Sequence, residues 1–417
     1  MNNKIVSSEK NIIHLNLPTI EAAVGKIYID DLIKSDVEGK IVFIRVDMNV
    51  ALKADGTIQD DLRIRKTLAT IQKVIDLGGK VVIATHMGRP KGKWIEELTT
   101  KPIANRLSEL LGQKVTHAPD CIGEEVTKMK QDLKNGEVLF LENLRFYKEE
   151  TDNDSTFASK LAEGVDLVVN DAFACCHRAH ASIKGITEHV ELTAGGLLVK
   201  SELLGFEPLK NAQKPLVAII GGAKISSKIT VVENILPFVD QMIIGGAMAN
   251  TFSLAKGHSM GDSMVEDEMI ETAKRIMKNF GDKIIIPSDY LVTDDFANPG
   301  TVKEVAEDGV ELGWNAVDIG KQTVEQIKTI LEKAKTVFVN GPMGAYDKNE
   351  LFSFGTMMVY KTLGAIDAYT AGGGGETRDA LAKSGTSLNH ASTAGGAFLE
   401  TVQGAELPGV FALSDRP

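Results

Sequence analysis

The stretch IVFIRVDM, residues 41–48, decides the fold class. Its first six residues are apolar apart from Arg45, and a helical pattern, RKTLATIQKVIDLG, follows at residues 65–78. A second apolar run, VVIATHM, begins at Val81, so strand and helix alternate as in a β–α–β unit. The runs are continuously apolar, which is typical of parallel strands covered by helices on both faces. This stretch therefore predicts an α/β fold built on a parallel sheet.

The same alternation continues along the chain and falls into two sets. The first set continues through VLFLENLRF and closes with LVVNDAF at residues 167–173. After KSELLGFEPLKNAQKP, the second set begins at Pro215 and runs through PLVAIIGG, QMIIGGAM, KIIIPSDYLV, KTVFVNGPM and AYTAGGGG. A chain of 417 residues is also too long for one ordinary domain. We therefore predict two doubly wound parallel-sheet domains.

Composition and charge narrow the classes of partner and compartment. The formal net charge of −11 repels polyanions, so we expect no nucleic-acid partner and no acidic membrane surface. Three cysteines, Cys121, Cys175 and Cys176, are too few for a disulfide framework and fit a reducing compartment. The first residues lack the apolar core of a signal peptide, and no apolar run is long enough to span a membrane. We predict a cytoplasmic protein.

Charged and polar residues gather where the strands of the first set end. Ligands of open parallel sheets bind beyond the carboxyl ends of the strands. Guanidinium groups bind phosphate and carboxylate through two hydrogen bonds, so several arginines at these ends indicate a site for a small polyanion. Each of them alone is also the ordinary partner of a surface salt bridge. The arginines are Arg63, Arg89, Arg145 and Arg178, and Asp47, Asn49 and His86 add groups that can orient hydroxyl or carboxylate oxygens.

Glycines replace these charges in the second set. Gly221-Gly222-Ala223-Lys224 lies between a strand and the helical pattern ISSKITVVENILPFV, which favours phosphate binding at a helix N-terminus. Gly372–Gly375 repeats the arrangement before Glu376, whose carboxylate is suited to Mg²⁺ held between phosphate oxygens. Neither GxxxxGK[ST] nor GxGxxG occurs here, which counts against a P-loop ATPase and a dinucleotide dehydrogenase.

Cys175, Cys176, His177 and His180 carry the ligand types that zinc prefers. No second segment supplies the remaining ligands, and cysteine is commonly a small buried residue. We expect no zinc site there.

Several long motifs in order resemble phosphoglycerate kinase from near residue 26 to the C-terminus. They are RVDMNV, HMGRPKG, LENLRFYKEE, DAFACCHRAHAS, GGAKISSKI, GGAMANTF, NGPMGAYD, GGGGET and ASTAGGA. The resemblance implies two Rossmann-like domains joined by a hinge, acting as a monomer. It implies reversible phosphoryl transfer between ATP and 3-phosphoglycerate, giving ADP and 1,3-bisphosphoglycerate, with Mg²⁺.

The resemblance also implies a division of the chain into functional segments. Residues 1–25 would be an N-terminal extension, 26–200 the 3-phosphoglycerate domain and 201–214 the hinge. Residues 215–403 would be the nucleotide domain, and 404–417 would return to the N-terminal domain.

Residue roles follow from the same resemblance. Arg63, Lys224 and Gly374 would be catalytic, and Glu376 would hold the metal. Substrate binding would fall on Asp47, Asn49, Arg63, His86, Arg89, Arg145 and Arg178. Nucleotide binding would fall on Gly222, Ala223, Lys224, Lys228, Gly246, Asn340, Pro342, Asp347, Gly374, Gly375, Glu376 and Thr377.

The chain also departs from the family pattern. Glu376 stands where Asp is usual and Asp347 where Glu is usual, so each carboxylate changes its reach by one methylene. Alanine at positions 174, 247, 316 and 394 replaces glycine, and a methyl group there can block close backbone approach or forbid a positive φ. Ala69 replaces Pro, Val339 replaces Trp and Ser227 replaces Asp. The alternative to an active kinase is therefore a catalytically impaired binding or regulatory protein with the same fold.

Overall fold

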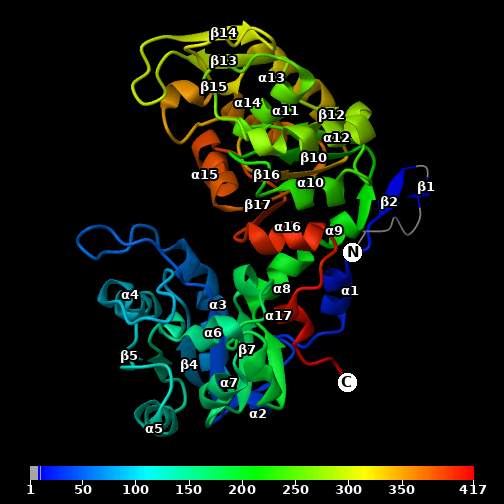
Figure 1. The fold of residues 1–417 in the computed structure, drawn as a ribbon. Helices are drawn as coiled ribbons and strands as arrows, with labels where there is room; N and C mark the ends of the chain where they lie inside the picture. The colour runs from blue at the N-terminus through cyan, green and yellow to red at the C-terminus, as the bar shows by residue number, and fades with distance from the viewer. Residues whose placement is uncertain (1–7, 10) are drawn as a thin grey trace. The chain divides into compact units, whose positions relative to one another are not determined.

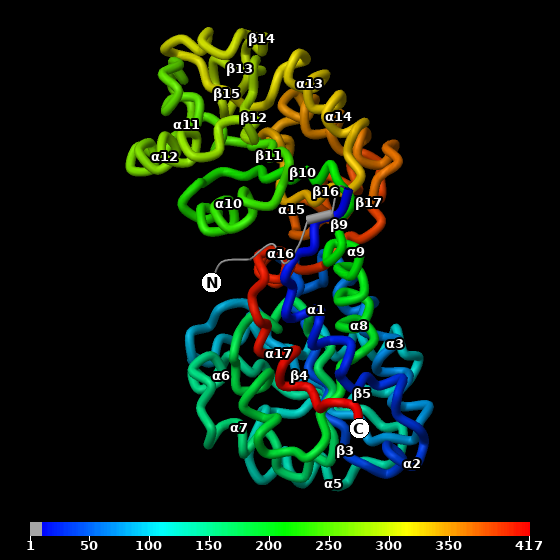
Figure 2. The backbone as a smooth tube through the Cα atoms, turned by 90° about the vertical axis from the view of Figure 1, so that its right-hand side faces the viewer, coloured from blue at the N-terminus to red at the C-terminus, as the bar shows by residue number. Residues whose placement is uncertain are grey.

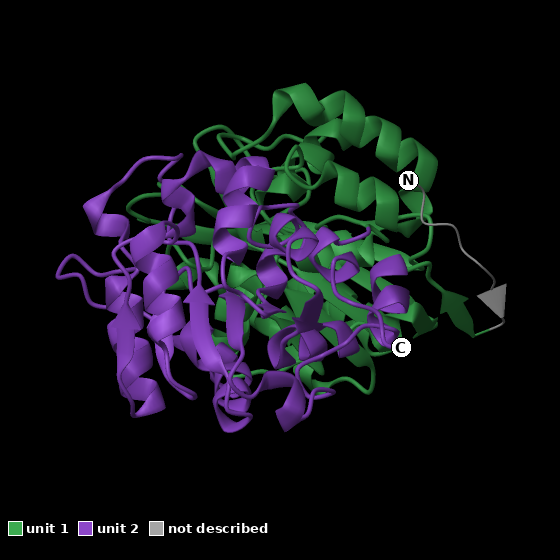
Figure 3. Cartoon of the chain, turned by 90° about the horizontal axis from the view of Figure 1, so that it is seen from below, with its two compact units in different colours: residues 1–17, 205–405 green, residues 18–204, 406–417 purple. Residues whose placement is uncertain are grey.

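A computed structural model describes residues 8, 9 and 11–417, and these form two compact units (Figures 1 and 3). Unit 1 takes the described residues up to Leu17 together with 205–405, and unit 2 takes residues 18–204 and 406–417. The chain therefore passes between the units at three points. The N-terminal extension predicted at residues 1–25 lies partly outside the described residues.

Unit 2 is built on a six-stranded sheet in which every pair of neighbours is parallel, as the sequence predicted. Its order is β5-β6-β4-β3-β7-β8. The strands are β3 (Ile41–Val46), β4 (Lys80–Ala84), β5 (Val115–His117), β6 (Val138–Phe140), β7 (Leu167–Asp171) and β8 (Leu192–Gly195). The prediction that LVVNDAF closes this set is wrong, because β8 adds a further edge strand. Its four residues, LTAG, are too short and too small to read as a strand.

Helices cover both faces of this sheet, which explains the continuously apolar strands. Val42 and Ile44 of β3 pack on one side with Ile64 and Ile71 of α3 (Leu62–Asp76). Ile41 and Phe43 belong to a separate core on the other side, with Leu161 of α7 (Ser155–Ala162). The other helices are α1 (Pro18–Val24), α2 (Lys34–Val37), α4 (Lys101–Leu111), α5 (Glu124–Asp132), α6 (Lys148–Asp152), α8 (Leu197–Leu204) and α17 (Pro408–Phe411).

The last twelve residues of the chain belong to unit 2. Figure 2 shows this segment, in red, running beside α1, and α17 packs on that helix. Lys26 Nζ donates to Leu413 O at 2.8 Å and pairs with Asp415 Oδ1 at 2.7 Å. Asn170 Nδ2, at the end of β7, donates to Gly409 O at 3.1 Å. The two ends of the unit 2 sequence thus complete one packed body.

Unit 1 contains a second six-stranded parallel sheet, also as predicted, in the order β12-β11-β10-β16-β17-β18. Its strands are β10 (Leu216–Ile220), β11 (Gln241–Ile244), β12 (Ile284–Ile285), β16 (Thr336–Asn340), β17 (Tyr369–Gly373) and β18 (His390–Ser392). The helices are α9 (Glu207–Lys210), α10 (Ile229–Ile235), α11 (Ala247–Lys256), α12 (Ile270–Phe280), α13 (Lys321–Leu331), α14 (Phe354–Ala365), α15 (Gly375–Ser384) and α16 (Gly396–Val402).

The stretch KIIIPSDYLV is not one strand of this sheet. It divides at Pro287, which has no N–H to donate to a neighbouring strand. The part before it is β12, and the part after it is β13 (Asp289–Thr293), which pairs antiparallel with β14 (Val302–Ala306) and β15 (Asn315–Ile319). A smaller antiparallel sheet joins β1 (Ser8–Glu9), β2 (Ile12–His14) and β9 (Asn211–Gln213). The sequence patterns predicted neither antiparallel sheet.

Strand order fixes where each unit can bind a ligand. In unit 1 the chain leaves β10 toward β11 on one side and leaves β16 toward β17 on the other. The crevice at such a switch point opens beyond the carboxyl ends of the two strands. In unit 2 the same reversal occurs between β3 and β7. In the described part of the chain, no helix combines the length and hydropathy that crossing a membrane would require.

Candidate functional site

A buried polar network supports the switch point of unit 2. Arg45, in the otherwise apolar strand β3, is fully buried, and its Nε donates to Ser182 Oγ at 2.7 Å. Ser182 Oγ donates to Glu150 Oε1 at 2.6 Å, and Ser182 N donates to Glu150 Oε2 at 2.9 Å. Burial raises the pKa of Glu150, which the charge of Arg45 opposes. Sequence reasoning missed this network, although a lone Arg in an apolar strand signals that a partner must be buried with it.

The residues after β3 are held in defined orientations. Asp47 Oδ2 pairs with Arg63 Nη1 at 2.5 Å, with Arg63 placed at the second position of α3. Asn49 Oδ1 accepts from Gly88 N at 2.9 Å, which ties this loop to the one after β4. The Asp47 and Arg63 side chains are partly exposed, so both remain accessible to a ligand.

His86 lies two residues after the end of β4 and is buried. Burial lowers its pKa well below the usual value, and the charges of Arg45, Arg145 and Arg63 lower it further. Arg45 Nη2 lies 3.3 Å from His86 Nδ1, which fits a neutral ring accepting at that nitrogen. The other ring nitrogen is then the one that carries the proton.

Three of the predicted arginines line a cavity of about 310 Å³: Arg89, Arg145 and Arg178. Arg63 does not line it. Arg145 Nη1 donates to Gly88 O at 3.0 Å, whereas its Nε is buried with no hydrogen-bond partner among the described residues. Sequence reasoning missed Lys91 and Lys148, which line the same cavity. Lys91 has a φ of 58°, which is uncommon for a residue with a side chain.

Among the thiols and imidazoles considered for zinc, Cys175, Cys176 and His180 have different neighbours. Cys176 Sγ contacts Asn170 Nδ2 and Ala172 O, and His180 Nδ1 lies 3.7 Å from Glu150 Oε1. Cys175 instead lies near His86 and Asp47, and the ligand atoms of these three residues are within 4.8 Å of one another. Asp47 is paired with Arg63, and Arg45 lies against His86 and Cys175, so a cationic side chain contacts each of these three residues.

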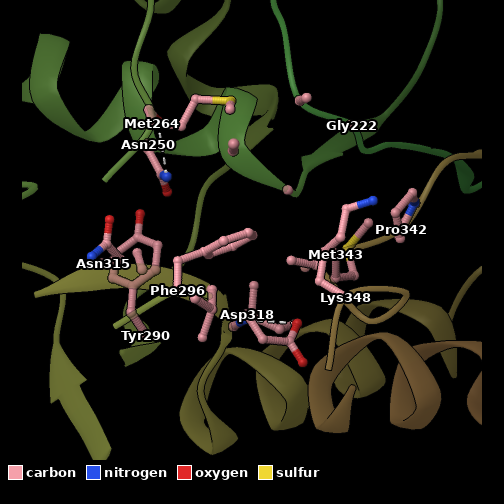
Figure 4. Close-up of a pocket in the computed structure, with 18 of the residues that line it drawn as sticks. Gly222, Asn250, Met264, Tyr290, Phe296, Asn315, Asp318, Pro342, Met343 and Lys348 are labelled. Carbon is pink, nitrogen blue, oxygen red and sulfur yellow. Dashed lines mark hydrogen bonds between the residues drawn. The ribbon is translucent and has the colours of Figure 1, made fainter. Parts of the chain in front are cut away.

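Unit 1 carries a cavity of about 590 Å³ beyond the carboxyl ends of β10, β11 and β16 (Figure 4). Its loops approach so closely that side chains cannot fit between them. A Cβ on Gly221 would lie 1.8 Å from Pro342 O, and one on Gly246 would lie 2.5 Å from Gly222 O. These glycines leave backbone, rather than side chains, along the cavity wall.

Lys228 fills the crevice between β10 and β16. Its Nζ donates to Gly221 O and, at 2.7 Å, to Asn340 Oδ1. Asn340 Nδ2 in turn donates to Gly373 O at 2.6 Å, which links β16 to β17. Burial lowers the pKa of Lys228 to about 8, against the raising effect of the Glu376 carboxylate. A buried ammonium at this position provides a charge near the glycine loops.

The N-terminus of α15 faces this cavity, but Thr377 does not cap it. The helix begins at Gly375 after Gly374, which has a φ of 105° and a ψ of 157°, and no side chain caps its first turn. Thr377 is buried and its Oγ1 accepts from Gly341 N at 2.9 Å, so it holds the loop after β16 instead. Glu376 lines the cavity. The Thr377 hydroxyl therefore anchors a neighbouring loop and does not cap α15.

The helix predicted directly after Lys224 begins later in the structure. Residues 221–228 form a loop, and α10 starts at Ile229. Lys224 is exposed in this loop and does not line the cavity. The nucleotide set divides accordingly. Six of the predicted nucleotide-binding residues line the cavity: Gly222, Ala223, Gly246, Pro342, Asp347 and Glu376. Five more adjoin the loops that border the cavity: Lys228, Asn340, Gly374, Gly375 and Thr377. Lys224 belongs to neither group.

Two alanines that replace family glycines reach the cavity. Ala247, the first residue of α11, and Ala316 of β15 both line it. Lys91 and Asn153 are the residues other than glycine with a positive φ in the described part of the chain, so neither alanine is strained. Compared with glycine, the methyl groups of Ala247 and Ala316 take up space in the cavity without distorting the backbone.

Two doubly wound units, one with a cationic cavity and one whose cavity borders glycine-containing loops at its strand ends, fit an α/β phosphotransferase. The family model for phosphoglycerate kinase matches residues 29–405. The chain belongs to the phosphoglycerate kinase family and is a phosphotransferase with a carboxyl group as acceptor.

Individual relatives support this assignment over nearly the whole chain. The phosphoglycerate kinase of Chloroherpeton thalassium is 48% identical over 387 residues, which are 90% of this chain and 97% of the relative. That of Picosynechococcus sp. is 45% identical over 391 residues, covering 92% and 98%. The solved phosphoglycerate kinase structure from Coxiella burnetii is 34% identical, with a TM-score of 0.81 over 93% of this chain and 98% of its own.

Proposed function

We propose that unit 2 binds 3-phosphoglycerate and unit 1 binds ATP or ADP in the phosphoglycerate kinase reaction of this chain. The observation that carries this division is the contrast between the cavities. Three arginines and two lysines line the first cavity, whereas the second is lined mainly by backbone and apolar side chains, with the carboxylates of Asp262, Asp318, Asp347 and Glu376. The unit boundaries modify the predicted segments, because the described residues up to Leu17 go with the nucleotide unit.

The substrate would be held by charge and oriented by hydrogen bonds. Arg89, Arg145 and Arg178 would neutralise its phosphate, with the unpaired Nε of Arg145 as one available donor. Asp47, Asn49 and His86 would orient its hydroxyl and carboxylate groups. Arg63, near Asp47 but outside the cationic cavity, would stabilise the phosphoryl group during transfer.

The nucleotide phosphates would lie against the glycine loops of unit 1. Backbone N–H groups at the start of α15 and the Lys228 ammonium would attract them, and Gly374 allows close approach. Lys224 would meet the transferred group from its exposed loop. Transfer then needs positioning and charge neutralisation rather than a covalent intermediate, and it requires the two units to bring their ligands together.

Mg²⁺ forms part of this proposal, and the residues present fit it. Glu376 lines the cavity, and its carboxylate makes no hydrogen bond or ion pair with any described residue. Mg²⁺ takes oxygen ligands, keeps several waters and is commonly held by one carboxylate and substrate phosphates. Glu376 would hold it, and the bound ion would neutralise phosphate charge. A cytoplasmic monomer is the setting that we propose for this reaction.

A metal titration of three proteins tests these roles: the parent, Glu376→Asp and Glu376→Gln at fixed nucleotide concentration. We expect Glu376→Gln to lose most Mg²⁺-dependent turnover and Glu376→Asp to retain or improve it. Glu350→Gln, which removes an exposed carboxylate outside the cavity, is the control. Equal turnover and equal Mg²⁺ midpoints in the parent and all three variants would contradict a role for Glu376 in holding the metal. An inactive parent would favour the impaired binding protein.

A further inference from the structure

The loop after β16, residues 341–348, forms one side of the cavity shown in Figure 4, where Pro342 and Met343 are labelled. Six of its residues line that cavity: Pro342, Met343, Gly344, Ala345, Asp347 and Lys348. Tyr346, in the middle of this run, does not line the cavity and is only 5% exposed. Any influence of Tyr346 on a bound ligand must therefore act through the residues that it contacts.

Tyr346 contacts the helix α15. Its hydroxyl donates to Glu376 O at 2.9 Å, and Glu376 is the second residue of that helix. Lys383 Nζ, in the last turn of α15, lies 4.8 Å from the centre of the Tyr346 ring and pairs with Asp379 at 3.0 Å. Both the ring and the hydroxyl of Tyr346 thus lie against α15.

The hydroxyl of Tyr346 keeps the proton that this hydrogen bond requires. Burial raises the pKa of Tyr346, and a hydrogen bond to the Asp379 carboxylate raises it further. Asp379 also belongs to α15, so both acceptors available to this proton lie on the same helix. The link between the loop and α15 is therefore retained at neutral pH.

A second hydrogen bond joins the other end of the loop to the same turn of α15. Gly341 N donates to Thr377 Oγ1 at 2.9 Å, one residue beyond Glu376. No side chain caps the first turn of α15, and the first N–H groups of a helix have no partner within the helix. The two hydrogen bonds with the loop therefore fix a turn that its own backbone bonds hold weakly.

The position of this turn decides where the Glu376 carboxylate lies. Glu376 has one more rotatable bond than the Asp that is usual in the family, and its carboxylate makes no hydrogen bond or ion pair with any described residue. The carboxylate is therefore located mainly by the backbone that carries it. Ordering a side chain around a bound ion costs conformational entropy, and a mobile backbone would add to that cost.

We propose that Tyr346 is a positioning residue for the metal carboxylate, because its hydroxyl holds the turn that carries Glu376 in place before Mg²⁺ and the nucleotide bind. This inference rests on the proposed function, in which Glu376 holds the metal. Tyr346 lies outside the cavity, so its effect is confined to the part of nucleotide binding that depends on Mg²⁺.

Calorimetry of ADP binding with and without Mg²⁺ measures this part. Tyr346→Phe removes only the hydroxyl. We expect it to weaken the binding of ADP in the presence of Mg²⁺ about fivefold, as the loss of one hydrogen bond implies. The affinity for ADP without Mg²⁺ should equal that of the parent. Equal weakening under both conditions would show general damage to the cavity and would contradict the proposal, as would an unchanged affinity under both.

The variant Glu376→Gln separates positioning from a merely structural role. It lacks the carboxylate but keeps the backbone carbonyl to which Tyr346 donates. Adding Tyr346→Phe to Glu376→Gln should therefore cause no further loss of Mg²⁺-dependent binding. If Tyr346→Phe weakened this binding equally in the parent and in Glu376→Gln, Tyr346 would not act through the carboxylate and the proposal would be wrong.

Tyr369→Phe is the matched control. The hydroxyl of Tyr369, on β17, also donates to a backbone carbonyl, Gly205 O, but neither residue lines the cavity of Figure 4. We expect Tyr369→Phe to bind ADP as the parent does under both conditions, and a loss like that of Tyr346→Phe would contradict a specific role. If Glu376→Gln itself left Mg²⁺-dependent binding unchanged, the metal role in the proposed function would fail. If only Tyr346→Phe left it unchanged, the proposed function would stand and the role of Tyr346 would be refuted.

Discussion

Arg63 is the residue whose charge is expected to matter most during transfer. It lies at the start of α3 and pairs with Asp47 at 2.5 Å, so its guanidinium is oriented before substrate binds. We predict that Arg63→Ala lowers turnover about 10²–10³-fold, as removal of one donor to developing charge typically does, and leaves nucleotide affinity unchanged. Arg65→Ala is the control, because Arg65 pairs with Asp61 on the same helix. Near-parental turnover in Arg63→Ala would contradict the assigned role.

Lys228 should make nucleotide binding depend on pH. Burial lowers the pKa of Lys228 to about 8, so its charge is present below pH 8 and is lost as the pH rises above it. Attraction for the phosphates is lost over the same range. We predict that KM for ADP rises about tenfold between pH 7 and pH 9.5, as loss of a charge-assisted hydrogen bond implies. Arginine stays charged throughout, so KM of Lys228→Arg should be flat. If KM for ADP changed with pH in the same way in the parent and in Lys228→Arg, Lys228 would be excluded as the cause of the pH dependence.

The helix α15 has a glycine with a positive φ at each end, so the effects of alanine at the two ends can be compared. Gly374 precedes the helix with a φ of 105° and a ψ of 157°, a region essentially restricted to glycine. Gly385 ends it with a φ of 67° and has nothing within 4 Å of an added Cβ. We predict that alanine lowers the free energy of unfolding by about 1–2 kcal/mol at either site. Only Gly374→Ala should also lose turnover, measured in the kinase assay, and equal turnover in both variants would contradict this.

The sequence predicted the elements best where one pattern dominates. Continuously apolar runs gave both parallel sheets, and glycine and arginine at their ends located the two cavities. Predictions from local sequence patterns were wrong where the hydrogen-bond partner of a residue lies far away in the sequence. Thr377 lies in the first turn of a helix, yet its hydroxyl accepts from Gly341 N of another loop, which nothing near it in the sequence indicates. The helical pattern after Lys224 is interrupted because Ser226 instead bonds Glu266, forty residues away, at 2.5 Å.

Other parts of the site could not be inferred because their signals are not local. Lys91 and Lys148 are ordinary surface lysines in the sequence, and only the fold places them beside the three arginines. Pro287 was a visible signal that the run KIIIPSDYLV divides. The position of β13 depends on its pairing with β14 and β15. No periodicity within the run KIIIPSDYLV specifies that pairing.

At the scale of the whole molecule, the C-terminal segment should stabilise unit 2 without acting on nucleotide binding. Leu407 is fully buried, and its N donates to Thr19 Oγ1 at 2.9 Å. We predict that Leu407→Ala lowers the free energy of unfolding of unit 2 by about 3 kcal/mol. Phe411→Ala, at a side chain that is 39% exposed, should cost much less. Calorimetry measures both, and an equal loss in the two variants, or a changed affinity for ADP, would contradict this.

We propose that the chain moves a phosphoryl group between a nucleotide bound on unit 1 and a phosphoglycerate bound on unit 2. A coupled assay of ADP-dependent ATP formation from 1,3-bisphosphoglycerate, with and without Mg²⁺, tests it most directly. We predict ATP formation that requires ADP, 1,3-bisphosphoglycerate and Mg²⁺ together. We also predict that Arg145→Gln raises KM for 1,3-bisphosphoglycerate without changing KM for ADP. No ATP formation by the folded parent, or an equal rate after Mg²⁺ is removed by a chelator, would contradict it.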